Sequence, residues 1–210
     1  RARYSNRLVP TVGLAEELAA NAPLYAGIAE PPELSKRPGW GARGGMKDAS
    51  STDVLIHRGR VLSTFYQCGD AYAFDAKDLA SLGRETWGGR FPSDTGISAH
   101  PKVDERTGEM LFFGYNMMGF DLAKGGAKVP YLQYSVVNPR GEITMTTPID
   151  LPRGVMMHDF AVSEHYSIFM DLPLVFDMQR AVKGESPLYF DRDLPARFGL
   201  LPRHADGAQV

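Results

Sequence analysis

The feature that most constrains this chain is a succession of short apolar segments, separated by turns rich in glycine, proline, asparagine and aspartate. Apolar segments of about 4–8 residues between such turns predict β-strands. The expected strands are Val54–His57, Val61–Tyr66, Ala71–Asp75, one that starts at Ile97–His100, Glu109–Tyr115, Tyr131–Val137, Glu142–Thr147, Met157–Val162, Tyr166–Met170 and Leu172–Phe176. We therefore expect an all-β fold. Units of four short strands in succession favour the blades of a β-propeller over a sandwich.

Three other segments are expected to differ from this pattern. Val12–Ala20 is made of good helix formers, which predicts a short helix. Ala76–Leu82 is expected to form a short helical turn between two strands. Residues 31–51 are rich in glycine, proline and charge, which predicts a surface loop.

Composition and charge limit the classes of protein to which the chain can belong. It has 210 residues, of which 43% are hydrophobic and 23% charged, an ordinary globular composition. The net charge of −2 gives no reason to expect nucleic acid as a partner. The single cysteine, Cys68, cannot form an internal disulfide, which favours a reducing, cytoplasmic compartment. No apolar run approaches the roughly 18 residues of a membrane span. The chain opens without methionine, and we interpret it as an internal fragment.

Histidine is the residue type most suited to chemistry here, and the chain has five: His57, His100, His158, His165 and His204. We expect His57 to be an ordinary strand residue, and we expect His165 and His204 to be solvated in a turn and a polar tail. His100 and His158 each stand at the predicted start or head of a strand, and an aspartate follows each closely. Their separation in sequence fits no local ligand motif. They can meet only if their strands converge on a shared axis, so a common metal site and two unrelated histidines both stay open.

Several motifs together resemble those of the carotenoid cleavage oxygenases, a family that also includes the lignostilbene dioxygenases. In chain order they are Tyr4–Thr11, His57–Leu62, Ser98–Asp104 followed by Thr107–Glu109, Met157–Phe160 followed by Asp171–Asp177, and Arg197–Arg203. The last of these looks like the strand that opens a further blade. The resemblance spans nearly the whole chain.

This resemblance implies a fold, a cofactor and an activity. The family fold is a seven-bladed β-propeller, of which this chain would supply about two to three blades. Four histidines near the axis hold one Fe(II), and His100 and His158 match the first two. Neutral imidazoles suit iron, and open coordination positions suit O₂. The implied partners are O₂ and an apolar conjugated molecule lying in a tunnel, with peripheral membrane contact for substrate uptake as a further expectation. One double bond is split into two carbonyl products.

The chain departs from the family in ways that bear on these expectations. Nothing after Arg203 matches the third and fourth histidines, so the 210 residues alone are expected to be inactive. Gln67 falls where the family has a glutamate that orients an imidazole, and glutamine accepts a hydrogen bond without charge. Phe65 and Tyr66, the expected tunnel residues, lie where lignostilbene-cleaving members have a lysine. This favours a carotenoid or apocarotenoid substrate over a stilbenoid, which is the alternative. A non-catalytic β-propeller binding module is the alternative from another class.

Overall fold

The computed structural model describes residues 4–27, 30, 32–37, 46–65, 69–91, 96–115, 120–121, 127–128, 130–177, 179–180 and 183–210. This part of the chain is mostly β, as expected, with the helix α1 (Val12–Ala20) and the short 3-10 helices η1 (Pro32–Leu34) and η2 (Gly207–Gln209). The strands are β1 (Asp53–His57), β2 (Arg60–Thr64), β3 (Ala71–Asp75), β4 (Ser81–Glu85), β5 (Lys102–Val103), β6 (Met110–Tyr115), β7 (Phe120–Asp121), β8 (Ala127–Lys128), β9 (Leu132–Val137), β10 (Ile143–Ile149), β11 (Phe160–Val162), β12 (Tyr166–Asp171), β13 (Leu174–Phe176), β14 (Leu188–Phe190) and β15 (Arg197–Pro202). Among the described residues, no helix has the length and apolar character needed to cross a membrane.

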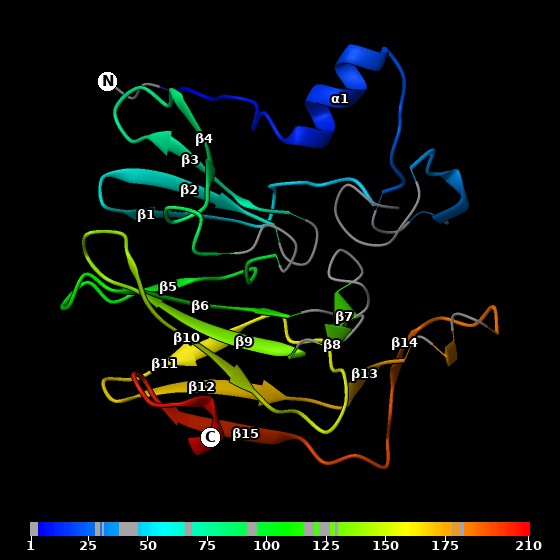
Figure 1. Ribbon diagram of the computed structural model, residues 1–210, viewed down its shortest axis with the longest axis vertical. Helices are drawn as coiled ribbons and strands as arrows, with labels where there is room; N and C mark the ends of the chain where they lie inside the picture. The colour runs from blue at the N-terminus through cyan, green and yellow to red at the C-terminus, as the bar shows by residue number, and fades with distance from the viewer. Residues whose placement is uncertain are drawn as a thin grey trace.

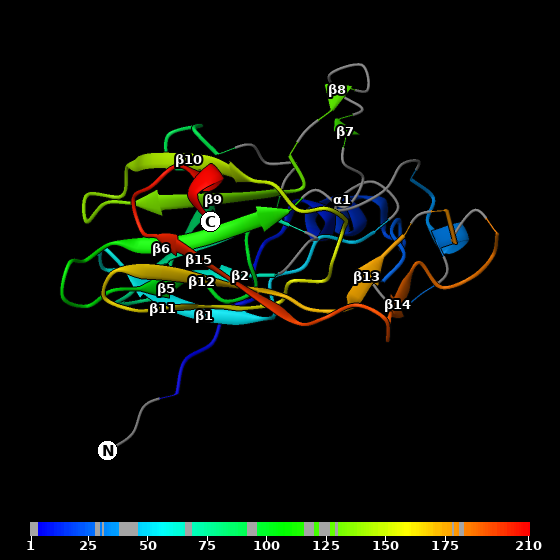
Figure 2. The same ribbon diagram turned by 90° about the horizontal axis from the view of Figure 1, so that it is seen from below.

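Three antiparallel sheets stack one above another, in the order in which the chain reaches them (Figure 1). The first sheet has the order β1-β2-β3-β4, the second β10-β9-β6-β5 and the third β11-β12-β15. Figures 1 and 2 both place α1 and the small hairpins β7–β8 and β13–β14 on one side of this stack, at one end of the strands. The turns β5–β6 and β11–β12 lie at the opposite end.

The first sheet is a simple meander, and it corrects one prediction. Its first turn is Arg58-Gly59, whose φ angles of 56° and 69° match a type I′ hairpin. The predicted helical turn Ala76–Leu82 is shorter than expected: the Leu79 N–H donates to the Asp75 carbonyl at 3.0 Å and closes a single turn, and β4 already begins at Ser81. Leu79 adopts a φ of 59°, and the backbone N–H at position 75 donates to the carbonyl at position 80 at 2.9 Å. The pairing of β3 with β4 therefore outweighs the helical preference of a few residues.

The two central strands of the second sheet, β6 and β9, are buried on both faces because the other two sheets pack against them. Every residue of β6 is buried, and successive side chains of a strand point to opposite faces. One set packs with the third sheet in a cluster that includes Leu111, Phe113, Tyr115, Tyr134, Phe160, Phe169 and Leu201. The other set packs with the first sheet in a cluster that includes Met110, Phe112, Leu62, Ala73 and Trp87. This double burial explains the continuous apolar run in the sequence of β6.

The third sheet corrects the interpretation of Arg197–Arg203 as the opening of a further blade. β15 pairs antiparallel with β12 along its whole length, from Tyr166 opposite Pro202 to Asp171 opposite Arg197. It is therefore the third strand of the sheet that β11 and β12 begin. Leu201, fully buried, anchors this strand in the apolar cluster shared with the second sheet.

The helix α1 forms as predicted and is held at its start by two oxygens. Thr11 Oγ1 accepts a hydrogen bond from the N–H of Leu14 at 3.1 Å, the usual role of an N-cap threonine. Asp48 Oδ1 accepts one from the N–H of Gly13 at 2.9 Å. Asp48 is buried although it belongs to the predicted surface loop 31–51, so the end of that segment enters the protein interior. The surface-loop assignment for the rest of the segment stays a prediction.

Candidate metal site

His100 and His158 lie close together at the end of the strands on the side of α1. His100 precedes β5 by two residues and His158 precedes β11 by two residues, and β5 and β11 are edge strands of neighbouring sheets. The two Nε2 atoms are 3.2 Å apart, and the rings meet edge to face with centroids 5.0 Å apart. Two nitrogens that share one ion must lie within about 4 Å, since metal–nitrogen bonds are about 2.0–2.1 Å long. The imidazole pair meets this condition.

Two ion pairs join the segments of the second and third sheets that follow the histidines. Lys102 Nζ lies 2.7 Å from Asp159 Oδ1, and both residues are within two positions of the histidine pair. The same oxygen accepts the backbone N–H of Phe160 at 2.8 Å. In the turns that follow β5 and β11, Arg106 lies 3.7 Å from Glu164. The Lys102–Asp159 pair thus joins the two strand starts.

The surroundings of His158 favour its neutral form, the form that ligates metal. Burial lowers the pKa of His158 below its ordinary value, and the neighbouring His100 lowers it further. Asp159 acts in the opposite direction and raises the pKa.

The part of the chain that the structure describes holds no group of three or more His, Cys, Asp or Glu side chains able to bind a metal. Of the predicted site residues that the structure describes, His100 and His158 are the pair brought together. Gln67 and Tyr66 lie outside the described residues, and their expected roles stay predictions. Phe65 is half-buried directly after β2. Its neighbour Thr64 donates a hydrogen bond to the carbonyl of Ala99 at 2.9 Å, so the end of β2 lies against the segment that carries His100.

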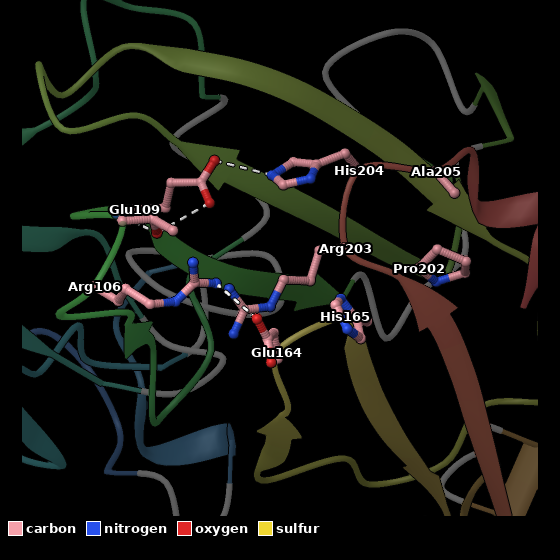
Figure 3. A pocket seen from close by; sticks show the side chains of 9 residues that line it. Arg106, Glu109, Glu164, His165, Pro202, Arg203, His204 and Ala205 are labelled. Carbon is pink, nitrogen blue, oxygen red and sulfur yellow. Dashed lines mark hydrogen bonds and ion pairs between the residues drawn. The ribbon is translucent and has the colours of Figure 1, made fainter.

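The other histidines lie away from this pair. His57 is buried, and its Nε2 lies 3.1 Å from the carbonyl oxygen of Gly108, so it is a packed strand residue. His165 and His204 are exposed, as expected. They line a pocket of about 480 Å³ at the opposite end of the strands (Figure 3). His204 Nε2 is bonded to Glu109 Oε1 at 2.9 Å.

The pocket of Figure 3 has opposite charges on its walls. Its lining residues are Arg106, Thr107, Glu109, Glu164, His165, Pro202, Arg203, His204 and Ala205. Arg203 is buried and forms an ion pair with Asp104. The hydrogen bond from Arg203 holds the pKa of the Asp104 carboxyl below its usual value. Pockets for apolar ligands are lined mainly by hydrophobic side chains, so this pocket does not suit a long conjugated substrate.

The partners of the two histidines were not predictable from the sequence. Asp53, the first residue of β1, has its Oδ2 3.0 Å from His100 Nδ1. Lys102 and Asp159 stand beside the histidines in sequence, but their mutual contact joins two sheets. No spacing in the sequence signals either contact, because both arise only when the three sheets stack.

Comparison with known proteins agrees with this fold. The crystal structure of Pseudomonas brassicacearum lignostilbene dioxygenase superposes with a TM-score of 0.73 at 26% identity, over 96% of this chain and 39% of that chain. The carotenoid 9,10(9',10')-cleavage dioxygenase 1 of Phaseolus vulgaris is 37% identical over 164 residues, which are 76% of this chain and 28% of the relative. The isoeugenol monooxygenase of Pseudomonas nitroreducens is 34% identical over 165 residues, 78% of this chain and 32% of the relative.

The fold defines a mostly β protein of the carotenoid oxygenase class. The family described as "Retinal pigment epithelial membrane protein" matches residues 1–210. The chain belongs to this family, the carotenoid cleavage oxygenases that the sequence motifs indicated. It spans about a third or less of the length of these curated relatives.

Proposed function

We propose that the protein is a non-haem Fe(II) dioxygenase that uses O₂ to cleave one conjugated carbon–carbon double bond into two carbonyl products. His100 and His158 would be two of its four iron ligands. The observation that carries the proposal is the 3.2 Å approach of the two Nε2 atoms from neighbouring sheets, in a chain of the carotenoid cleavage oxygenase family. Each histidine stands two residues before an edge strand of its sheet. This matching placement favours a shared site over two independently packed histidines.

The sheets suggest how such a site is completed. We infer that the three stacked sheets are successive blades of a seven-bladed propeller, with β5 and β11 nearest the axis. The starts of inner strands then converge on the axis, which accounts for the meeting of histidines from two sheets. Two further histidines from other blades would complete the ligand set.

The residues present have distinct tasks in this reaction. Bound Fe(II) would supply the activation of O₂, which the protein's own side chains cannot perform. His100 and His158 would each offer a neutral Nε2, and four neutral imidazoles leave the charge of the ion undiminished. The Lys102–Asp159 ion pair would link the two segments that carry the ligands. Phe65, Tyr66 and Gln67 are proposed at the adjacent tunnel wall, the first two against substrate and the third beside an imidazole.

The proposed substrate is a carotenoid or apocarotenoid, because Phe65 and Tyr66 stand where a lysine would engage a phenol. Carotenoid-cleaving relatives support this choice. A stilbenoid substrate is the second candidate, since a lignostilbene dioxygenase is among the similar structures. The cytoplasmic compartment and membrane contact during substrate uptake remain predictions from the sequence.

Product analysis of the full-length protein that carries this sequence tests the proposal. The protein is loaded with Fe(II) and incubated separately with apocarotenals and with hydroxystilbenes, and the aldehydes formed are identified by mass spectrometry. Aldehydes from apocarotenals support the proposed substrate, and aldehydes from hydroxystilbenes alone favour the second candidate. If neither set gives aldehydes while the protein is folded and metal-loaded, the proposed reaction is wrong, and a non-catalytic binding module becomes the better account.

A further inference from the structure

We propose that Asp53 is a positioning residue of the metal site, which fixes the ring of His100 so that its Nε2 lone pair faces His158. The inference rests on the proposed function, because it assumes that His100 binds a metal. Its basis is a contact between different sheets: Asp53 begins β1 of the first sheet, and His100 precedes β5 of the second. Asp53 Oδ2 lies 3.0 Å from His100 Nδ1.

The direction of this hydrogen bond determines which nitrogen of His100 is available. A carboxylate can only accept hydrogen bonds, so the hydrogen must be on Nδ1 of the imidazole. A neutral imidazole carries one hydrogen, and Nε2 of His100 therefore bears the lone pair. This is the nitrogen that lies 3.2 Å from His158 Nε2. Asp53 thus selects the tautomer in which His100 can ligate at the point of convergence.

The carboxylate is itself held in place, so it can orient the ring. Asp53 Oδ1 accepts the backbone N–H of Val54 at 2.7 Å, which leaves Oδ2 for His100. Thr64 is the strand partner of Asp53 across β1 and β2 and is fully buried. Its hydroxyl lies 2.9 Å from the carbonyl oxygen of Ala99, the residue before His100. The same threonine therefore ties the first sheet to the backbone of the ligand segment.

The contact between Asp53 and His100 is partly shielded from water. The side chains of Asp53 and His100 are only 33% and 29% exposed. A freely solvated carboxylate would exchange its partner for water, whereas this one is fixed on one oxygen by its own backbone. Removal of the partner that orients a ligating imidazole typically weakens metal affinity by about 10–100-fold. We expect a loss of this size when Asp53 is removed.

Metal affinity of the full-length protein tests the inference. Fe(II) or Co(II) is titrated against a competing chelator into the wild type, Asp53→Ala and Asp53→Asn, and thermal unfolding of the metal-free forms is followed in parallel. Asp53→Ala is expected to bind metal about 10–100-fold more weakly. Asp53→Asn keeps an amide oxygen that can accept from Nδ1, so it should recover part of the loss. The visible spectrum of the Co(II) form should change in Asp53→Ala.

Asp78→Ala provides the matched control. Asp78 lies in the same sheet and also accepts a backbone N–H, from Ala80 at 2.8 Å, but it is exposed in the β3–β4 turn. Its removal should leave metal affinity within about twofold of the wild type. Tight wild-type binding with equal affinity in Asp53→Ala would overturn the positioning role while leaving the metal site intact. A wild type that binds no metal would overturn the proposed function itself, and this inference with it.

Discussion

Phe160→Ala is expected to destabilise the full-length protein by about 3–5 kcal/mol, the usual cost of truncating a buried phenylalanine. Phe160 is 2% exposed, and it is the first residue of β11, two residues after His158. Its ring is stacked on that of Phe169, with centroids 5.7 Å apart, and meets the ring of Phe113 of the second sheet edge to face, with centroids 5.3 Å apart. The truncation therefore removes contacts within the third sheet and between two sheets. Phe160→Leu keeps most of the apolar volume and should cost clearly less.

A double-mutant cycle isolates the contact between the sheets. Phe113→Ala, Phe160→Ala and the double variant are compared by urea unfolding followed by circular dichroism. An edge-to-face aromatic pair contributes about 0.5–1.5 kcal/mol beyond its buried area, so the coupling energy should fall in this range or above it. A loss below about 1 kcal/mol in Phe160→Ala would refute the account of the core. A coupling energy near zero would mean that the two sheets are not packed through these rings.

Three further outcomes follow from single contacts. Burial lowers the pKa of His57 below its ordinary value of 6.5, so the unfolded state binds more protons near that pH. Stability should therefore fall as pH decreases through about 6.5. The urea midpoints at pH 8 and pH 6 should differ less in His57→Gln than in the wild type. Gly13→Ala should lower stability by about 1 kcal/mol or more, because its Cβ would lie 2.3 Å from Asp48 Oδ1; an unchanged melting temperature would contradict this contact. The Lys102 and Asp159 side chains are 31% and 41% exposed, so their double-mutant cycle should give at most about 1 kcal/mol, and a larger value would mean that the pair is less solvated than the structure indicates.

The sequence was informative about the fold wherever local pattern and final packing agree. The helix Val12–Ala20 and the hairpin around Arg58-Gly59 form as expected, because propensity and turn chemistry act locally. The helical turn Ala76–Leu82 was predicted too long, since pairing with β3 already starts at Ser81. The assignment of Arg197–Arg203 to a further blade was wrong, because an apolar strand pattern does not specify which neighbour the strand will join.

The candidate site was predictable only as far as its histidines. His100 and His158 share a place at the start of a strand and match the motifs of one family, and both signals are present in the sequence. Asp53 gave no such signal, because its contact with His100 depends on the stacking of two sheets. The same is true of the ion pair between Lys102 and Asp159.

Metal binding by the full-length protein tests the central claim most directly. Wild type, His100→Ala and His158→Ala are titrated with Fe(II) or Co(II) under anaerobic conditions, with His165→Ala and His204→Ala as controls at the opposite end of the strands. The account predicts one metal per chain in the wild type and in both controls. It predicts that loss of either ligand weakens binding by more than the roughly 10–100-fold seen when only an outer partner is removed. Equal affinity in all five proteins would contradict it.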